Sequence, residues 1–196
     1  MMAFVDLIRH GEPVGGRRYR GQLDDPLSEL GWRQMRSAVA AQRPWRHIIS
    51  SPLLRCSEFA AELGQRLQLP LEIEPRLMEI GFGRWEGQTA EQIEASEPGA
   101  LRRFYDDPVR GAPPGAEELE HFHQRVLAAW QMIIRRDAEM PVLVVAHAGV
   151  IRAIVGEVLG MPPGNMFKLQ VANAGISRIH VSDALQTVLE FHNARL

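Results

Sequence analysis

The sequence has a single cysteine, Cys56, which excludes an intrachain disulfide and a cysteine-based zinc site. It also has no long apolar segment: the clean run at 142–146 is about a quarter of the roughly 18 residues that a membrane helix needs. The first nine residues contain no basic cluster or long apolar stretch, and they carry Asp6. We therefore expect no signal peptide and a cytoplasmic protein.

Lysine is nearly absent, because Lys168 is the only one among the 22 basic residues and the other 21 (22 − 1) are arginine. An arginine fork binds phosphate and carboxylate groups bidentately, although the base composition of a genome produces the same bias. The formal net charge of −2 does not favour a nucleic-acid partner, and we expect no membrane partner either.

The chain that remains is ordinary for a globular protein, with 196 residues, 45% of them hydrophobic and 23% charged. This composition supports a full hydrophobic core and excludes disorder and collagen. The proline- and glycine-rich segment at 107–115 does not divide two apolar cores. We therefore predict one domain that spans residues 1–196.

Apolar spacing predicts strands and helices that alternate along the chain. Expected strands lie at 3–9, 47–50, 71–74, 142–146, 168–172, 176–181 and 187–191. Expected helices lie at 30–42 after the N-cap Ser28, from Pro52 to about 67, at 89–106 as two short helices, at 117–136 and at 150–159. The unalternating run at 142–146 is typical of a central strand that is covered on both faces. The pattern predicts an α/β fold, a three-layer α/β/α sandwich with a mostly parallel central sheet.

Polar residues follow the ends of four predicted strands or the loops that they lead to. The first strand ends at Arg9 and His10, the second is followed by Arg55, the third leads to Glu79, and the strongest strand ends at His147. Ligands of open α/β sheets bind beyond the carboxyl ends of the strands, so we expect these five side chains to converge.

These groups suit phosphoryl transfer without a metal ion or another cofactor. A neutral imidazole is a nucleophile near pH 7, and two guanidinium forks can hold the oxygens of a phosphoryl group. A carboxyl group such as that of Glu79 can protonate the leaving oxygen and then take a proton from water. An alternative is that Glu79 only pairs with Arg76 or Arg84.

The order and spacing of five motifs resemble the histidine phosphatase superfamily, the phosphoglycerate mutase-like family. The motifs are Arg9-His10-Gly11-Glu12, Gly21-x-x-Asp24-x-Pro26-Leu27-Ser28, Ser50-Ser51-Pro52-x-x-Arg55, Glu79-x-x-Phe82-Gly83-x-Trp85-Glu86-Gly87 and His147-Ala148-Gly149. The resemblance implies His10 as the phosphorylated nucleophile and Glu79 as the proton donor. It further implies a phosphate pocket of Arg9, Arg55 and His147. Substrate contacts are expected from Gly11, Arg20, Gly21, Gln22 and Ala148.

Within this superfamily the short chain most resembles the α-ribazole phosphatases of cobalamin nucleotide-loop assembly. The expected substrate is therefore a small phosphorylated metabolite, bound by a monomer or a homodimer. A cofactor-dependent phosphoglycerate mutase and a non-catalytic phosphate-binding regulatory module stay open as alternatives. The chain departs from the family pattern in the substrate-facing loop, where Arg20 replaces a small hydroxyl residue.

Two further features have competing interpretations. Arg17, Arg18 and Arg20 form either a solvated loop or a contact for an anionic part of the substrate. Cys56 beside Arg55 lacks the arginine six positions later that a cysteine phosphatase loop requires, so we do not expect a thiol nucleophile.

Overall fold

The computed structural model describes residues 3–40, 44–136 and 140–194, and its strands form one six-stranded sheet in the order β3-β2-β4-β1-β5-β6. The strands are β1 (Ala3–Arg9), β2 (His47–Ser50), β3 (Leu71–Ile73), β4 (Val142–Ala146), β5 (Ile176–Val181) and β6 (Thr187–Ala194). The first four run parallel, whereas β5 and β6 are antiparallel to their neighbours. The expected α/β class and mostly parallel sheet are thus confirmed.

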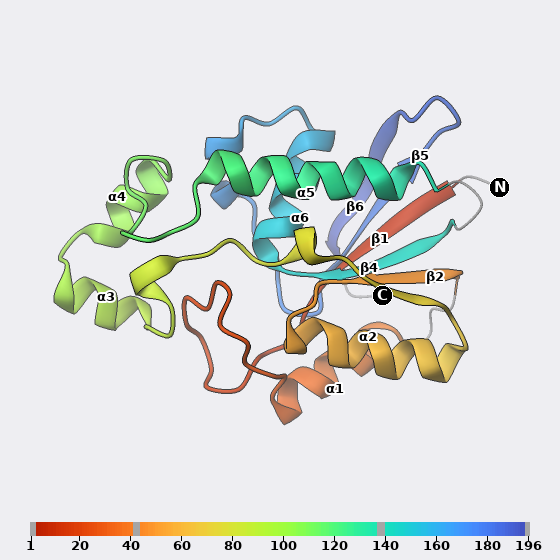
Figure 1. Ribbon diagram of the computed structural model, residues 1–196, viewed down its shortest axis with the longest axis horizontal. Coiled ribbons are helices and arrows are strands. Elements are labelled where there is room, and N and C mark those ends of the chain that lie inside the picture. The colour runs from red at the N-terminus through yellow and green to blue at the C-terminus, as the bar shows by residue number, and fades with distance from the viewer. Residues whose placement is uncertain (1–2, 41–43, 137–139, 195–196) are drawn as a thin grey trace.

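Helices cover both faces of this sheet (Figure 1). They are α1 (Glu29–Ala38), α2 (Leu54–Leu67), α3 (Ala90–Ser96), α4 (Ala100–Asp106), α5 (Leu119–Ile134) and α6 (Ala148–Val158). In β4, Val142 and Val144 pack in the core beneath α5 and α6, while Leu143 and Val145 pack in the core beneath α1 and α2. All four are completely buried, because alternate side chains of one strand enter opposite cores. The expected three layers and the buried central strand are confirmed.

Helices α3 and α4 lie beyond one end of the sheet (Figure 1). They form a small core of their own in which Ile93 and Phe104 pack against Trp85. The predicted pair of short helices at 89–106 is therefore confirmed. Within the part of the chain that the structure describes, no helix is long and apolar enough to cross a membrane.

The strand predicted at 168–172 is wrong. A 3₁₀ helix occupies Pro163–Lys168, and the chain then runs without a strand partner up to β5. Its backbone bonds to side chains instead: the carbonyl of Val171 accepts from Arg9, and the amide of Ala172 donates to Asn193. These groups are therefore not available for a sheet ladder.

The predicted helix at 30–42 is also too long. Helix α1 starts directly after the predicted N-cap Ser28, whose hydroxyl accepts from the amide of Gly31, but it ends at Ala38. Val39 leaves the helix and buries its side chain in the core between α1, α2 and the sheet. The predicted last residue, Gln42, lies outside the described residues.

Candidate active site

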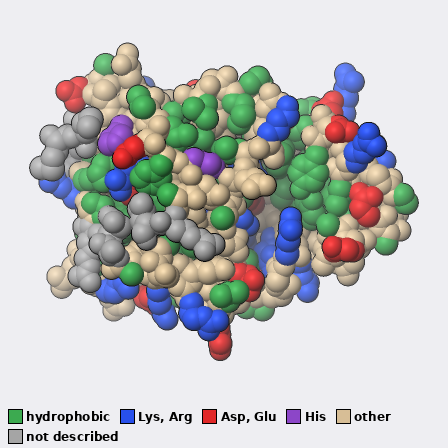
Figure 2. Space-filling view, turned by 180° about the vertical axis from the view of Figure 1, so that it is seen from behind, with side chains coloured by type: hydrophobic (Ala, Val, Ile, Leu, Met, Phe, Trp, Pro, Cys, Tyr) green, Lys and Arg blue, Asp and Glu red, His purple; other side chains and the backbone are tan. Residues whose placement is uncertain are grey.

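A cleft of about 750 Å³ opens between the carboxyl ends of the central strands and the α3–α4 segment. Figure 2 shows the hollow, with basic and apolar side chains around it. Arg9, His10, Arg55 and Glu79 line it, although they lie far apart in the sequence. Four of the five side chains that were expected to converge thus meet at this cleft, whereas His147 is buried and does not line it.

His10 directly follows β1 and is only 5% exposed. Its Nδ1 lies 2.7 Å from the carbonyl oxygen of Gly11, which can only accept a hydrogen bond. The proton must therefore sit on Nδ1, and Nε2 keeps its lone pair. Burial and the charges of Arg9 and Arg55 hold the pKa of His10 well below its ordinary value of 6.5. His10 is thus a neutral imidazole at pH 7, with one basic nitrogen.

His147 lies behind His10 as the N-cap of α6 and is completely buried. The two ring centroids are 5.2 Å apart, and Nε2 of His147 is 2.7 Å from the hydroxyl oxygen of Ser51. Burial, followed by the charge of Arg55, lowers the pKa of His147 as well. At pH 7 the imidazole ring of His147 is therefore neutral and carries a single N–H group.

Two guanidinium groups flank the histidines, each held by backbone carbonyls. Arg9 donates from Nη1 to Val171 over 2.6 Å, and Arg55 donates to Leu23 and Gly21 over 2.6 and 2.7 Å. The Nε atoms of both arginines are buried without a hydrogen-bond partner in the described chain. Such orphaned donors are costly unless a ligand binds them, and a phosphate oxygen is a suitable acceptor. Burial lowers the pKa of Arg9 to about 10, so it stays charged at neutral pH.

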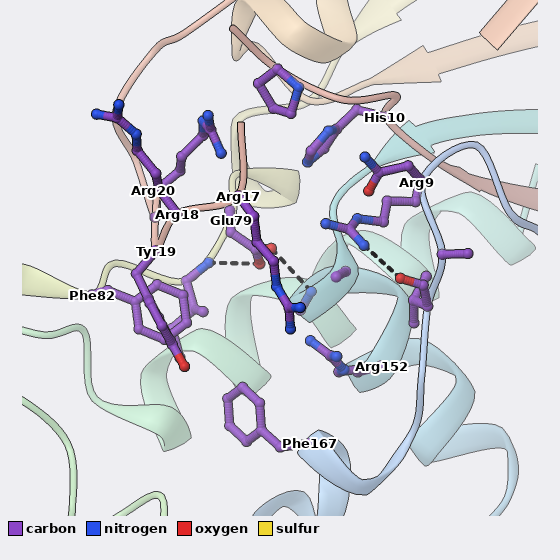
Figure 3. A pocket seen from close by; sticks show the side chains of 18 of the residues that line it. Arg9, His10, Arg17, Arg18, Tyr19, Arg20, Glu79, Phe82, Arg152 and Phe167 are labelled. Atoms are coloured by element: carbon purple, nitrogen blue, oxygen red, sulfur yellow. Dashed lines mark hydrogen bonds between the residues drawn. The ribbon is translucent and has the colours of Figure 1, made fainter. Parts of the chain in front are cut away.

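Glu79 is fixed in the cleft wall by two backbone amides (Figure 3). Its Oε1 accepts from Ile80 over 3.0 Å, and its Oε2 accepts from Gly149 at the start of α6 over 3.1 Å. The alternative ion pairs are wrong, because Arg76 pairs with Glu74 and Arg84 pairs with Glu97. The carboxyl group is thus anchored by backbone amides, forms no ion pair with an arginine among the described residues, and lines the cleft.

The five expected substrate contacts do not all meet at this cleft. Arg20, Gly21 and Ala148 line it. Gln22 lies in a second, shallow hollow, where its amide nitrogen donates to the backbone carbonyl of Glu79. Gly11 does not line the cleft. A Cβ at this position would overlap the backbone of Gly31, so the glycine allows α1 to pack closely against the loop after β1.

The three arginines of the loop after β1, Arg17, Arg18 and Arg20, differ in whether they form hydrogen bonds or ion pairs with the described residues. Arg20 is 8% exposed, forms an ion pair with Asp25 at 3.0 Å and donates to the carbonyl of Val14. Arg18 donates to the carbonyls of Gly15 and Gly87. Arg17 is exposed, and no hydrogen bond or ion pair to it occurs in the described parts of the chain.

Arg152 lines the cleft and was not among the predicted site residues. Arg152 follows Ala148 by four positions and Gly149 by three, so all three share one face of α6. That face opens on the cleft, and Arg152 lines it together with aromatic residues from other elements. Helical spacing after His147-Ala148-Gly149 puts Arg152 on that face, but only the tertiary structure shows that the face opens on the cleft.

Cys56 is not a nucleophile in this site. Its thiol is buried, lies 3.4 Å from the carbonyl oxygen of Ala146 and 3.6 Å from Nε2 of His147, and does not line the cleft. Burial raises the pKa of Cys56, so the thiol stays protonated.

Fold and site together suit an enzyme of phosphoryl transfer, and the comparison with known families agrees. The family model of the histidine phosphatase superfamily (branch 1) matches residues 5–194. The chain belongs to the histidine phosphatase superfamily, and it is a phosphatase.

The relatives differ in the substrates that their names state. The glucosyl-3-phosphoglycerate phosphatase of Mycolicibacterium vanbaalenii is 36% identical over 81% of this chain and 75% of its own length. Phosphoserine phosphatase 1 of Hydrogenobacter thermophilus is 31% identical over 97% of this chain and 92% of its own length. The solved structure of the α-ribazole phosphatase from Shigella flexneri has a TM-score of 0.84 and 26% identity, and it covers 98% of this chain and 96% of its own chain. The expected likeness to α-ribazole phosphatases is confirmed, alongside likeness to phosphatases of other substrates.

Proposed function

We propose that this phosphatase cleaves phosphomonoesters without a metal ion, through a phosphohistidine at His10. One observation carries the proposal: the hydrogen bond from Nδ1 to Gly11 leaves Nε2 of a neutral, buried imidazole as the free nucleophile. The Nε donors of Arg9 and Arg55, which have no hydrogen-bond partner among the described residues, supply positive charge beside it.

In the first step, Nε2 of His10 attacks phosphorus and the bond from phosphorus to the ester oxygen breaks. The carboxyl proton of Glu79 passes to the leaving oxygen, because an alkoxide is a poor leaving group. Arg9 and Arg55 neutralise the charge on the phosphoryl oxygens. The products are the free alcohol, phosphorylated His10 and an ionised Glu79.

In the second step, water attacks the phosphoryl group and the bond from phosphorus to Nε2 breaks. The carboxylate of Glu79 takes a proton from this water, which restores its acid form. Inorganic phosphate leaves and His10 is neutral again. The amides of Ile80 and Gly149 hold Glu79 in one place for both proton transfers.

The proposed substrate is a small sugar- or nucleoside-like phosphate. α-Ribazole phosphate, of cobalamin nucleotide-loop assembly, is one such compound, and the relatives' names point to glucosyl-3-phosphoglycerate and phosphoserine as others. The cleft of about 750 Å³ is large enough for a ligand that extends well beyond the phosphate.

A labelling experiment tests the phosphohistidine. The protein is mixed with a ³²P-labelled phosphomonoester in EDTA, quenched in base and mapped. We expect an acid-labile adduct on His10 that is lost in His10→Ala. A label on His147, or turnover that EDTA abolishes and a divalent cation restores, contradicts the proposal.

The same preparation separates a phosphatase from the two alternatives. Release of inorganic phosphate from a metabolite panel supports hydrolysis. Transfer between monophosphoglycerates after priming with the bisphosphate indicates a mutase. Tight binding of phosphate with neither activity indicates a regulatory module.

A further inference from the structure

Two arginines of the cleft take no part in the proposed phosphate site. Arg152 enters from α6 and Arg17 from the loop after β1, and both line the cleft (Figure 3). Neither forms an ion pair with a carboxylate in residues 3–40, 44–136 or 140–194. They differ in this from Arg20, which Asp25 neutralises.

Arg152 is held so that one edge of its guanidinium group faces the cleft. Its Nε donates to the carbonyl of Leu169 over 2.8 Å, and its Cζ lies 5.6 Å from the ring centroid of Phe167. For Nη1 and Nη2 there is no acceptor among the described residues. Two parallel N–H groups on one edge match the two oxygens of a carboxylate.

The positive charges of the cleft also repel one another. Burial is the main cause of the low pKa of Arg9, and the charges of Arg152, Arg55 and Arg17 lower it further. Burial lowers the pKa of Arg152, while the charge of Glu79 acts in the opposite direction without forming an ion pair. A phosphoryl group bound at His10 compensates Arg9 and Arg55, and it leaves Arg152 and Arg17 for a second anion.

The wall around Arg152 suits a carbon skeleton that carries hydroxyl groups. Phe82 and Phe167 contribute ring surfaces to the cleft. The hydroxyl oxygens of Tyr19 and Tyr105 are 2.7 Å apart at its side, where they can also bond to a ligand. The space beyond the phosphate thus combines apolar faces, hydroxyl groups and the positive charge of Arg152, which has no ion-pair partner among the described residues.

We infer that Arg152, aided by Arg17, binds a carboxylate on the leaving group of the substrate. The substrate class is then a phosphorylated hydroxy acid, free or carrying a further group such as a sugar. The leaving group of α-ribazole phosphate has a ribose and a heterocycle but no acidic group, so it cannot use this contact. The inference rests on the proposed function, because it takes the phosphoryl group to lie at His10.

The test compares two substrates that differ only at the carboxylate. 3-Phosphoglycerate and glycerol 3-phosphate share the phosphate ester, and a carboxylate in one replaces a hydroxymethyl group in the other. We expect the wild-type protein to favour 3-phosphoglycerate by at least about tenfold in kcat/KM, the usual value of a charge-assisted hydrogen bond. Arg152→Gln should lower this ratio by about 10- to 100-fold.

The ratio of the two substrates is the relevant measurement, because loss of a positive charge weakens phosphate binding for both. Arg17→Gln is the second variant: its side chain is exposed and bears no packing role, and it should lower the same ratio by a smaller factor. Arg102→Gln is the charge-matched control, since its side chain is 87% exposed on α4 and does not line the cleft. This control should leave both substrates unchanged.

The outcomes separate the inference from the function on which it rests. If the wild type hydrolyses both substrates with equal efficiency, or Arg152→Gln lowers both equally, the carboxylate contact is wrong and the phosphatase mechanism stands. If the wild type hydrolyses neither of them nor an aryl phosphate, the proposed function itself fails. A preference for 3-phosphoglycerate that Arg152→Gln removes supports both.

Discussion

Gly149 is the residue at which the geometry of Glu79 can be tested without touching the carboxyl group. A Cβ at Gly149 would overlap Oε1 of Glu79, and the ring of Phe122 lies 3.3 Å from the same point. Because Phe122 is buried against α6, the helix cannot shift to make room. In Gly149→Ala the carboxyl group must therefore move by on the order of 1 Å and lose its hydrogen bond to the amide of residue 149.

A displacement of about 1 Å costs roughly 10²-fold in rate, or about 2.7 kcal/mol of transition-state stabilisation. We expect this loss with glycerol 3-phosphate, whose alkoxide needs a proton. An aryl phosphate should lose much less, because its leaving group departs with little assistance. The fold should tolerate the change, since alanine is favoured over glycine in a helix by up to about 1 kcal/mol.

Burst kinetics with both substrates measure the phosphorylation step directly. Gly156→Ala is the matched control in the same helix, because its Cβ meets the flexible end of Met161 at 3.2 Å, far from the cleft. Equal losses on alkyl and aryl phosphates, or full activity of Gly149→Ala, would refute the role of Gly149 in positioning Glu79. The double variant with Glu79→Gln should be no slower than Glu79→Gln alone.

Other predictions concern the nucleophile, the acid and the phosphate pocket. Glu79→Gln should slow the burst with an alkyl phosphate by about 10²–10⁴-fold and with an aryl phosphate far less, and equal losses would exclude the acid role. Arg55→Ala should lose about 2 kcal/mol or more of transition-state stabilisation in kcat/KM, and Arg55→Lys should restore little, because one ammonium cannot replace the fork; full rescue by lysine would contradict bidentate binding. His10 must be neutral to attack and its pKa is lowered, so activity should persist below pH 6.5 and fall only as the pH passes through that lowered pKa. Arg55→Gln removes one cause of the shift, so the acid limb of kcat/KM should move up in pH; the ionisation of the substrate is common to both enzymes, and an unchanged or lower limb would contradict this cause.

Much of the site could be predicted because its residues stand at positions that local patterns identify. His10 and His147 directly follow apolar runs that read as strands, and Arg55 begins a helix with regular apolar spacing. Parallel strands place such residues at one edge of the sheet whatever the rest of the fold does. The prediction of a strand at 168–172 was wrong for the opposite reason. The side chains that form hydrogen bonds with its backbone, Arg9 and Asn193, come from distant parts of the chain.

Gly11 and Arg152 show where local patterns are insufficient. From the sequence, the missing Cβ of Gly11 could make space either for a phosphate group or for a neighbouring backbone segment. The packed position of Gly31 shows that it makes space for the backbone of α1. Arg152 reads as one more surface arginine of an amphipathic helix until the cleft and Phe167 are placed around it.

Apart from the strand wrongly predicted at 168–172, the sequence by itself determined the order of strands and helices along the chain, the family and most side chains at the carboxyl edge of the sheet, because each depends on short-range spacing. Only the tertiary structure shows which nitrogen of His10 carries the proton and that both site histidines have a low pKa. It also shows that Arg17 and Arg152 line the cleft without an ion-pair partner among the described residues. Those properties depend on burial and on distances between residues far apart in the chain, such as Arg9 and Val171, which are 162 positions apart. Burial and distance fix the local electrostatics, and they become defined only when the chain is packed.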